Sequence, residues 1–89
     1  MYKLELSKRA QKQIKKLDKS IQRLIIAWIE KNIANTDNPR QHGKGLTGDR
    51  SNEWRYRIGS YRLICDIRDE ELLILALEVG HRKEIYKAR

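Results

Sequence analysis

The strongest constraint on the fold of this chain is an alternation of apolar and charged residues around a two-residue turn. Apolar residues at 54, 56 and 58 alternate with Arg55 and Arg57, the pair Gly59-Ser60 follows, and residues 61–67 form a second apolar run. Alternation with period two predicts β-strands, and a glycine-containing pair between two such runs predicts a tight hairpin turn. We therefore expect an antiparallel hairpin in which Arg57 lies directly opposite Arg62.

The predicted hairpin has one charged face and one apolar face. Alternation along both strands places Arg55, Arg57 and Arg62 together, because side chains two residues apart share a face. The predicted core face carries the apolar residues Trp54, Tyr56, Ile58, Tyr61, Leu63, Cys65 and Ile67. Like charges directly opposite each other destabilise a sheet by up to about 1 kcal/mol, and an anion such as a phosphodiester would relieve the conflict. The alternative is a solvated face whose charge is balanced by Asp66 or Glu78.

The remaining segments predict an α+β fold in a single domain of residues 1–89. Residues 2–6 predict a short strand, and Ser7 is the expected N-cap of a first helix. A second amphipathic helix is expected from Ser20 to residues 35–39, antiparallel to the first. The glycine-rich residues 40–52 predict a loop, and residues 72–79 predict a central strand covered by the helices. The result is a short N-terminal strand, two antiparallel helices and a three-strand antiparallel meander, forming one small, mostly antiparallel sheet.

The composition favours an anionic partner inside the cell. The net charge is +8, and only residues 63–78 carry more acidic than basic side chains. Such a field attracts polyanions, for example nucleic acid or an acidic protein. Cys65 is the only cysteine, so we expect a reducing compartment, no cofactor and no zinc site. No signal peptide or membrane-spanning run is visible, which predicts the cytoplasm.

The C-terminal residues offer further polar groups. His81, Arg82 and Tyr86 follow the last predicted strand, and we expect them to project toward the face that carries the arginines. His81 is the group there that titrates near neutral pH, although a histidine in a tail is often a bystander. His42, in the glycine-rich loop, has the weaker claim. Cys65 is expected to be an inert core residue.

Three runs of sequence, at residues 38–48, 54–64 and 77–86, together resemble the RelE/ParE superfamily of toxins from type II toxin–antitoxin systems. Within the superfamily the chain is most similar to RelE. The resemblance covers the whole chain in length and element order. Its most specific pieces are Tyr61-Arg62-Leu63, at the start of a strand, and the ending Val79-Gly80-His81-Arg82 followed by Tyr86.

The resemblance implies a ribosome-dependent endonuclease that cuts mRNA in the A site. No metal takes part, because the ribose 2′-hydroxyl attacks the adjacent phosphate and leaves a 2′,3′-cyclic phosphate. By resemblance, Arg62 holds the scissile phosphate. Arg82 protonates the leaving group or stabilises the transition-state charge, and Tyr86 stacks on or orients the substrate base. The basic residues expected to contact RNA or the ribosome are Lys12, Lys15, Lys16, Lys44 and Lys83. The implied partner is an acidic, RelB-like antitoxin, through which the complex binds its operator DNA.

Two strand positions depart from the RelE pattern, which has lysines where this chain has Arg55 and Arg57. Arginine remains protonated in proteins, so these side chains can stabilise negative charge but cannot accept a proton. By resemblance to relatives that use a histidine there, His81 is the predicted proton-transfer group. Glu53 is a weaker candidate, because other toxins of the superfamily use a glutamate base. Two other functions remain open: a ParE-like toxin that inhibits DNA gyrase by protein contact, and a nucleic-acid-binding domain without catalysis.

Overall fold

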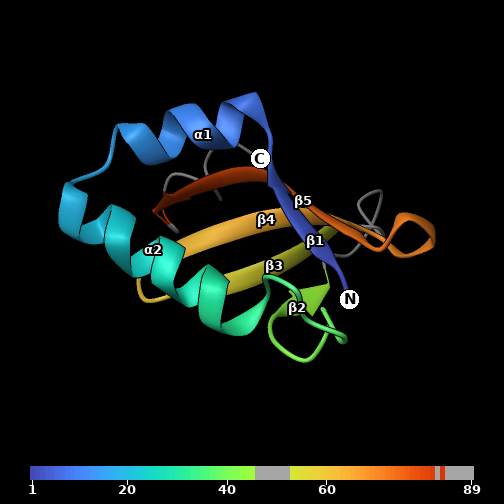
Figure 1. Cartoon of the computed structure of the whole chain (residues 1–89). Coiled ribbons are helices and arrows are strands. Elements are labelled where there is room, and N and C mark those ends of the chain that lie inside the picture. Colours follow the sequence, from blue (N-terminus) through green and yellow to red (C-terminus); the bar gives the residue numbers. More distant parts are fainter. Residues whose placement is uncertain (46–52, 82, 84–89) are drawn as a thin grey trace.

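The computed structural model describes residues 1–45, 53–81 and 83. Its elements are β1 (Lys3–Leu6), α1 (Lys8–Lys15), α2 (Lys19–Asn32), β2 (Lys44–Gly45), β3 (Glu53–Ile58), β4 (Tyr61–Arg68), the 3-10 turn η2 (Asp69–Glu71) and β5 (Leu73–His81). The five strands form one sheet in the order β1-β5-β4-β3-β2, and both helices pack on the same face of it (Figure 1). Only β1 and β5 pair in parallel. The predicted α+β class and the mostly antiparallel sheet are confirmed.

The first helix begins at a residue whose side chain satisfies a free backbone group. Ser7 is the N-cap of α1, as predicted, because its hydroxyl oxygen accepts a hydrogen bond from the amide of Ala10 at 3.0 Å. The same hydroxyl donates to the carbonyl of Leu77 in β5 at 3.0 Å, which fixes the start of α1 against the sheet. The second helix begins at Lys19 with Asp18 at its N-cap, so it starts one residue before the predicted Ser20. Neither described helix is long and apolar enough to cross a membrane.

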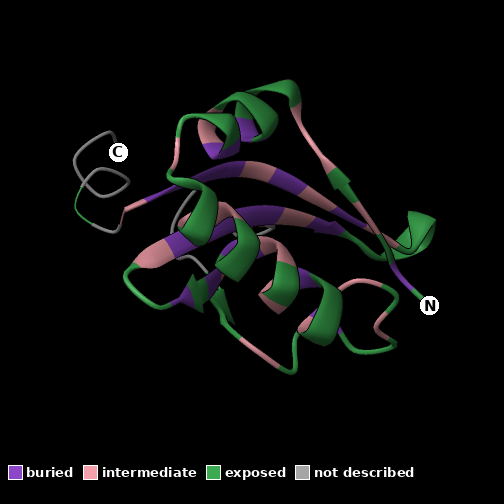
Figure 2. Ribbon diagram, turned by 60° about the vertical axis from the view of Figure 1, so that its left-hand side comes forward, coloured by how far each residue is buried: buried purple, intermediate pink, exposed green. Residues whose placement is uncertain are grey.

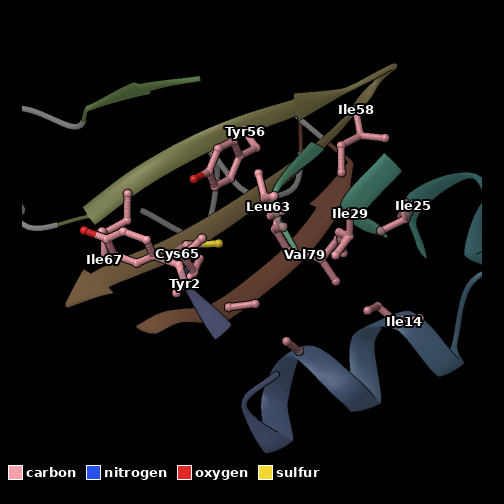
Figure 3. Packing of buried hydrophobic residues seen from close by; sticks show 14 residues of the cluster. Tyr2, Ile14, Ile25, Ile29, Tyr56, Ile58, Leu63, Cys65, Ile67 and Val79 are labelled. Carbon is pink, nitrogen blue, oxygen red and sulfur yellow. The ribbon is translucent and has the colours of Figure 1, made fainter. Parts of the chain in front are cut away.

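The core lies between the helices and the inner strands. Buried residues gather along β4, β5 and the sheet-facing sides of the helices, whereas the outer sides of the helices are exposed (Figure 2). Ile14 of α1 and Ile25 and Ile29 of α2 point toward the sheet (Figure 3). The predicted core face of the hairpin is confirmed at Tyr56, Ile58, Leu63, Cys65 and Ile67, all buried. Trp54 and Tyr61 are only partly buried.

The hairpin has the predicted turn and register. Gly59 adopts φ +60°, a conformation that favours glycine. Arg57 pairs directly with Arg62, and the pairing continues along β3 and β4 without a shift. One feature of the preceding loop differs from the prediction, because Lys44 and Gly45 form a short strand, β2, on the outer edge of β3.

A β-bulge interrupts the pairing of β4 with β5. Ala76 lies opposite Cys65, whereas Glu78 lies opposite the neighbouring Ile64, so Leu77 has no counterpart in β4. An extra residue of this kind reverses the alternation beyond it. The side chains at positions 74, 76, 79 and 81 therefore share the helix-covered face, and those at 78 and 80 share the opposite face.

Candidate nucleic-acid interface

Three arginines line the face of the sheet opposite the helices, and we call this surface the arginine face. Arg55 and Arg57 lie two residues apart in β3, and Arg62 lies directly opposite Arg57 in β4. The hairpin turn brings them together, because a two-residue connection fixes which residues of the two strands face each other. The predicted grouping of these arginines is confirmed by the register.

The outer part of the arginine face encloses a basic cavity of about 220 Å³. It is lined by Gly43, Lys44, Arg55 and Arg57. Lys44 belongs to the unpredicted strand β2 and lies opposite Arg55. The three cationic side chains present charge-assisted hydrogen-bond donors to one small volume, an arrangement that suits the oxygens of a phosphate.

Arg62, which by resemblance would hold the scissile phosphate, does not project into solvent. It is 3 % exposed, and its Nη1 donates to the carbonyls of Gly59 at 3.3 Å and of Tyr61 at 3.1 Å. Its Nε is buried and makes no hydrogen bond to any residue that the structure describes. Burying a charged donor without a hydrogen-bond partner costs free energy. An anion bound at this part of the face would supply the missing acceptor.

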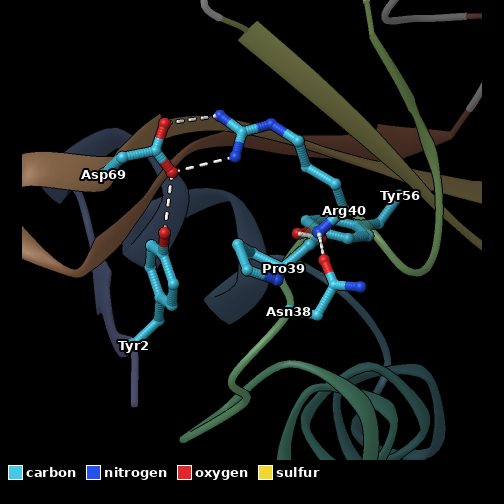
Figure 4. A network of polar contacts seen from close by, with 6 residues as sticks. All are labelled: Tyr2, Asn38, Pro39, Arg40, Tyr56 and Asp69. Carbon is cyan, nitrogen blue, oxygen red and sulfur yellow. Dashed lines mark hydrogen bonds and ion pairs between the residues drawn. The ribbon is translucent and has the colours of Figure 1, made fainter.

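The loop before Lys44 is held in place by a polar network (Figure 4). The guanidinium of Arg40 donates to both carboxylate oxygens of Asp69, at 2.8 and 2.9 Å, and the Tyr2 hydroxyl donates to the same carboxylate at 2.7 Å. These hydrogen bonds, with that of Arg40 the larger influence, lower the pKa of Asp69 to about 2. The N-terminus, the loop and the η2 turn are thereby tied together.

Two aromatic side chains of β3 fix the same loop from beneath. The Tyr56 hydroxyl donates to the carbonyl of Pro39 at 2.5 Å, and the Trp54 indole donates to the carbonyl of His42 at 2.6 Å. Burial raises the pKa of the Tyr56 phenol above its usual range. Gly43 adopts φ +83°, and a Cβ there would overlap the carbonyl oxygen of Arg55. These contacts position Lys44 beside Arg55, and alternation in the sequence gave no signal for them.

His81 lies on the other side of the sheet from the arginines, contrary to our prediction. It pairs with Tyr61, and the two rings meet edge-on with centroids 5.7 Å apart. Tyr61 packs against the core beneath the helices. The β-bulge causes this difference, because uninterrupted alternation would have turned His81 toward the arginines. His42 is likewise engaged elsewhere, with its ring 5.9 Å from that of Trp28.

The other predicted site residues lie apart from the cavity or outside the described residues. Lys12, Lys15 and Lys16 are exposed in or next to α1, which packs beside β5, whereas the cavity lies at the opposite edge, between β2 and β3. Lys83 is also exposed. Arg82 and Tyr86 lie outside the described residues. Within the described ranges, no three His, Cys, Asp or Glu side chains are placed to hold a metal ion.

Comparison with solved structures shows that the same fold occurs in several toxins. The chain matches the RelBE2 toxin–antitoxin complex of Mycobacterium tuberculosis with a TM-score of 0.81, 26 % identity and 91 % coverage of each chain. It matches the isolated RelE toxin of E. coli with a TM-score of 0.74, 23 % identity and coverage of 99 % and 94 %. The RelB–RelE complex of Methanococcus jannaschii gives a TM-score of 0.70, 24 % identity and coverage of 93 % and 95 %.

Sequence comparison identifies the family. No curated protein sequence matches the chain. A family model does match, over residues 4–86, and it describes the ParE toxin of the type II toxin–antitoxin system parDE. The match spans every described element except the first residue of β1, and it includes both strands of the arginine face. The chain therefore belongs to the ParE toxin family, within the RelE/ParE superfamily of toxins from type II toxin–antitoxin systems.

Proposed function

We propose that this toxin is a ribosome-dependent endonuclease that cuts mRNA by attack of a ribose 2′-hydroxyl on the adjacent phosphate. The observation that carries the proposal is the cavity lined by Lys44, Arg55 and Arg57, with Arg62 buried beside it. Arg57 lies directly opposite Arg62, and the buried Nε of Arg62 has no hydrogen-bond partner among the described residues, so an anion bound there would reduce both costs. A phosphodiester in a bound mRNA is such an anion.

The cations act on the transition state. Attack on phosphorus places extra negative charge on the phosphate oxygens, and fixed guanidinium donors stabilise that charge more than they stabilise the ground state. Loss of one such donor costs about 100- to 1000-fold in rate. As predicted by resemblance, Arg82 would serve the leaving group and Tyr86 the substrate base. Lys12, Lys15, Lys16 and Lys83 would bind ribosomal RNA.

Single-turnover cleavage of mRNA on programmed ribosomes tests this proposal. We expect Arg55→Ala and Arg62→Ala to cut at least about 100-fold more slowly than the wild type while remaining folded. Arg57→Lys should be milder than Arg57→Ala, because it keeps the charge but loses the guanidinium fork. Arg23→Gln removes an exposed arginine from α2, outside the arginine face, and is the matched control. Normal cleavage by Arg55→Ala and Arg62→Ala would disprove the proposal.

A second candidate is inhibition of DNA gyrase through protein contact. The family model that matches is that of a ParE toxin, which favours this activity, although the buried Arg62 and the basic cavity have no evident use in it. The purified toxin should be assayed in parallel for mRNA cleavage on ribosomes and for inhibition of DNA supercoiling by gyrase. Gyrase inhibition without mRNA cleavage would establish the second candidate and exclude the first.

The same charge distribution supports an acidic antitoxin as partner. Two of the structural neighbours described above are toxin–antitoxin complexes. A toxin of net charge +8 should associate with an acidic partner faster at low ionic strength. We expect the association rate, measured by stopped-flow mixing, to fall steeply between about 0.1 and 1 M salt, where the Debye length shrinks from about 10 to 3 Å. A rate independent of salt would exclude long-range attraction.

A further inference from the structure

The β-bulge at Leu77 gives the arginine face a carboxylate. In an uninterrupted strand, Glu78 would share the helix-covered face with Ala76, and Val79 would point to the arginines. The extra residue reverses both positions, so that Val79 enters the core and Glu78 pairs with Ile64 on the arginine face. Bulges often re-aim a side chain next to an active site. Because of the bulge, Glu78 lies on the arginine face and His81 lies on the opposite face.

Glu78 is the carboxylate of this face that lies nearest to Arg62 in the register. It lies opposite Ile64, which in turn lies opposite Arg55. It is also a diagonal neighbour of Arg62, because Arg62 pairs with Gly80, and diagonal neighbours are about 7–8 Å apart at Cα. In this register, Ile64 lies between Arg55 and Glu78 across the sheet, and Arg62 is the diagonal neighbour of Glu78.

The other carboxylates of the described face are less suitably placed. Asp66 accepts a hydrogen bond from Arg68 at 3.0 Å, which directs it away from the hairpin turn. Glu53 lies opposite Asp66, two pairs further from Arg62 than the Arg55–Ile64 pair. Glu78 alone of the three shares a row of the sheet with Arg55.

Glu78 is held by an ion pair with a helix residue. Arg9 of α1 approaches the carboxylate to 3.5 Å, and the side chain of Glu78 is 11 % exposed whereas that of Arg9 is 65 % exposed. This contact restricts the position of a largely covered carboxylate. Arg62 is buried as well.

We propose that Glu78 is the general base of this site and accepts the proton of the attacking ribose 2′-hydroxyl. The proposal rests on the endonuclease function proposed above, in which no arginine can take that proton. As the 2′-oxygen forms its bond to phosphorus, its proton moves to a Glu78 oxygen. The bond from phosphorus to the 5′-oxygen then breaks, and the 5′-oxygen leaves with the electron pair and takes a proton from water. The products are a 2′,3′-cyclic phosphate and a 5′-hydroxyl, and Glu78 returns its proton to solvent.

The test compares variants in single-turnover cleavage at saturating ribosomes, where the rate reports chemistry and not binding. Glu78→Gln keeps the size of the side chain but accepts no proton, and we expect it to cut at least about 100-fold more slowly. Arg9→Ala breaks the ion pair and leaves the base in place, so it should lose less than about tenfold. In Glu78→Ala, added formate should restore part of the rate, whereas it should restore none in Arg62→Ala. Thermal melting of each variant checks that it is folded.

The outcomes separate this proposal from the function on which it rests. If the wild type cuts and Glu78→Gln cuts within about threefold of it, Glu78 is not the base. If Glu78→Gln and Arg9→Ala are equally slow and formate restores nothing, Glu78 has a structural role only, and the proposal is wrong. If the wild type itself does not cut mRNA on ribosomes, the endonuclease function fails, and this proposal fails with it.

Discussion

Replacing Arg57 should stabilise the protein and inactivate it at the same time. Arg57 is exposed, and it lies directly opposite Arg62, which is 3 % exposed and accordingly poorly screened by solvent. Like charges at directly paired positions cost about 0.2–1 kcal/mol relative to neutral pairs. Arg57→Gln removes that repulsion and keeps a side chain of similar length. For a domain of this size, 1 kcal/mol corresponds to a shift in Tm of about 4–8 °C, so we expect an increase of about 1–8 °C.

Thermal unfolding of wild type and variant, followed by circular dichroism at low salt, measures the effect. Arg23→Gln is the matched control, because it lowers the net charge equally from an exposed position on α2. The difference between the two variants isolates the cross-strand repulsion from the general benefit of a lower net charge. Because Arg57 is exposed, the advantage of Arg57→Gln should also shrink as salt is added.

The two effects of Arg57→Gln are linked by one cause. The positive charge that destabilises the free sheet is the charge that stabilises a bound phosphate, so cleavage should fall by about 100- to 1000-fold as the Tm rises. A Tm equal to that of Arg23→Gln, or below that of the wild type, would refute the argument that the Arg57–Arg62 pairing is strained. It would also remove the main physical reason to expect an anion on this face.

Three further predictions concern the loop that positions the cavity. Gly43→Ala should weaken binding of a short oligoribonucleotide in a fluorescence titration, because its Cβ would overlap the backbone of β3 and displace Lys44. Tyr56→Phe leaves the carbonyl of Pro39 without its donor and should cost about 1–3 kcal/mol in urea unfolding. The lowered pKa of Asp69 means that its contribution to stability is present above about pH 4 and is lost as the pH falls toward 2. The Tm advantage of the wild type over Asp69→Asn should therefore disappear across that range.

The sheet could be predicted from the sequence wherever a regular pattern meets a well-defined turn. Alternation on both sides of Gly59-Ser60 fixes the register of β3 and β4, because a slip of one residue would expose the core side chains. The same reasoning correctly grouped Arg55, Arg57 and Arg62. It did not predict that Arg62 is buried. Alternation indicates on which face a side chain lies, but it does not indicate what covers that face.

The bulge could not be predicted, and its consequences extend to the site. Residues 72–77 are all apolar, so this part of the strand contains no polar position whose misplacement would reveal an extra residue. Glu78, the first polar residue after that run, is compatible with either face until the register is known. The same one-residue shift in register determines on which side of the sheet His81 lies. A strand without alternation therefore hid the most informative feature of the site.

The short strand β2 was missed for a related reason. Two residues are too few to show a period, and the glycines at positions 43 and 45 favoured a loop. The strand forms because Gly43 and Gly45 allow the chain to approach Trp54 closely. A Cβ added at Gly45 would lie only 3.2 Å from the indole ring. The strand therefore depends on contacts with β3, which the local sequence of residues 44 and 45 does not reveal.

The arrangement of charge across the sheet accounts for both the stability and the proposed chemistry of this chain. Along β4, this face passes from Arg62 at the hairpin turn to Asp66 and Arg68, which form an ion pair, so it changes from cationic to mixed charge over a few residues. A phosphate oxygen is favoured at the cationic end, and a proton acceptor is useful only at the boundary between the two. Glu78 occupies that boundary, and it does so because of one unpaired residue at Leu77. A one-residue bulge can therefore add the proposed general base to a cationic site. The residues proposed to bind the phosphate need not change.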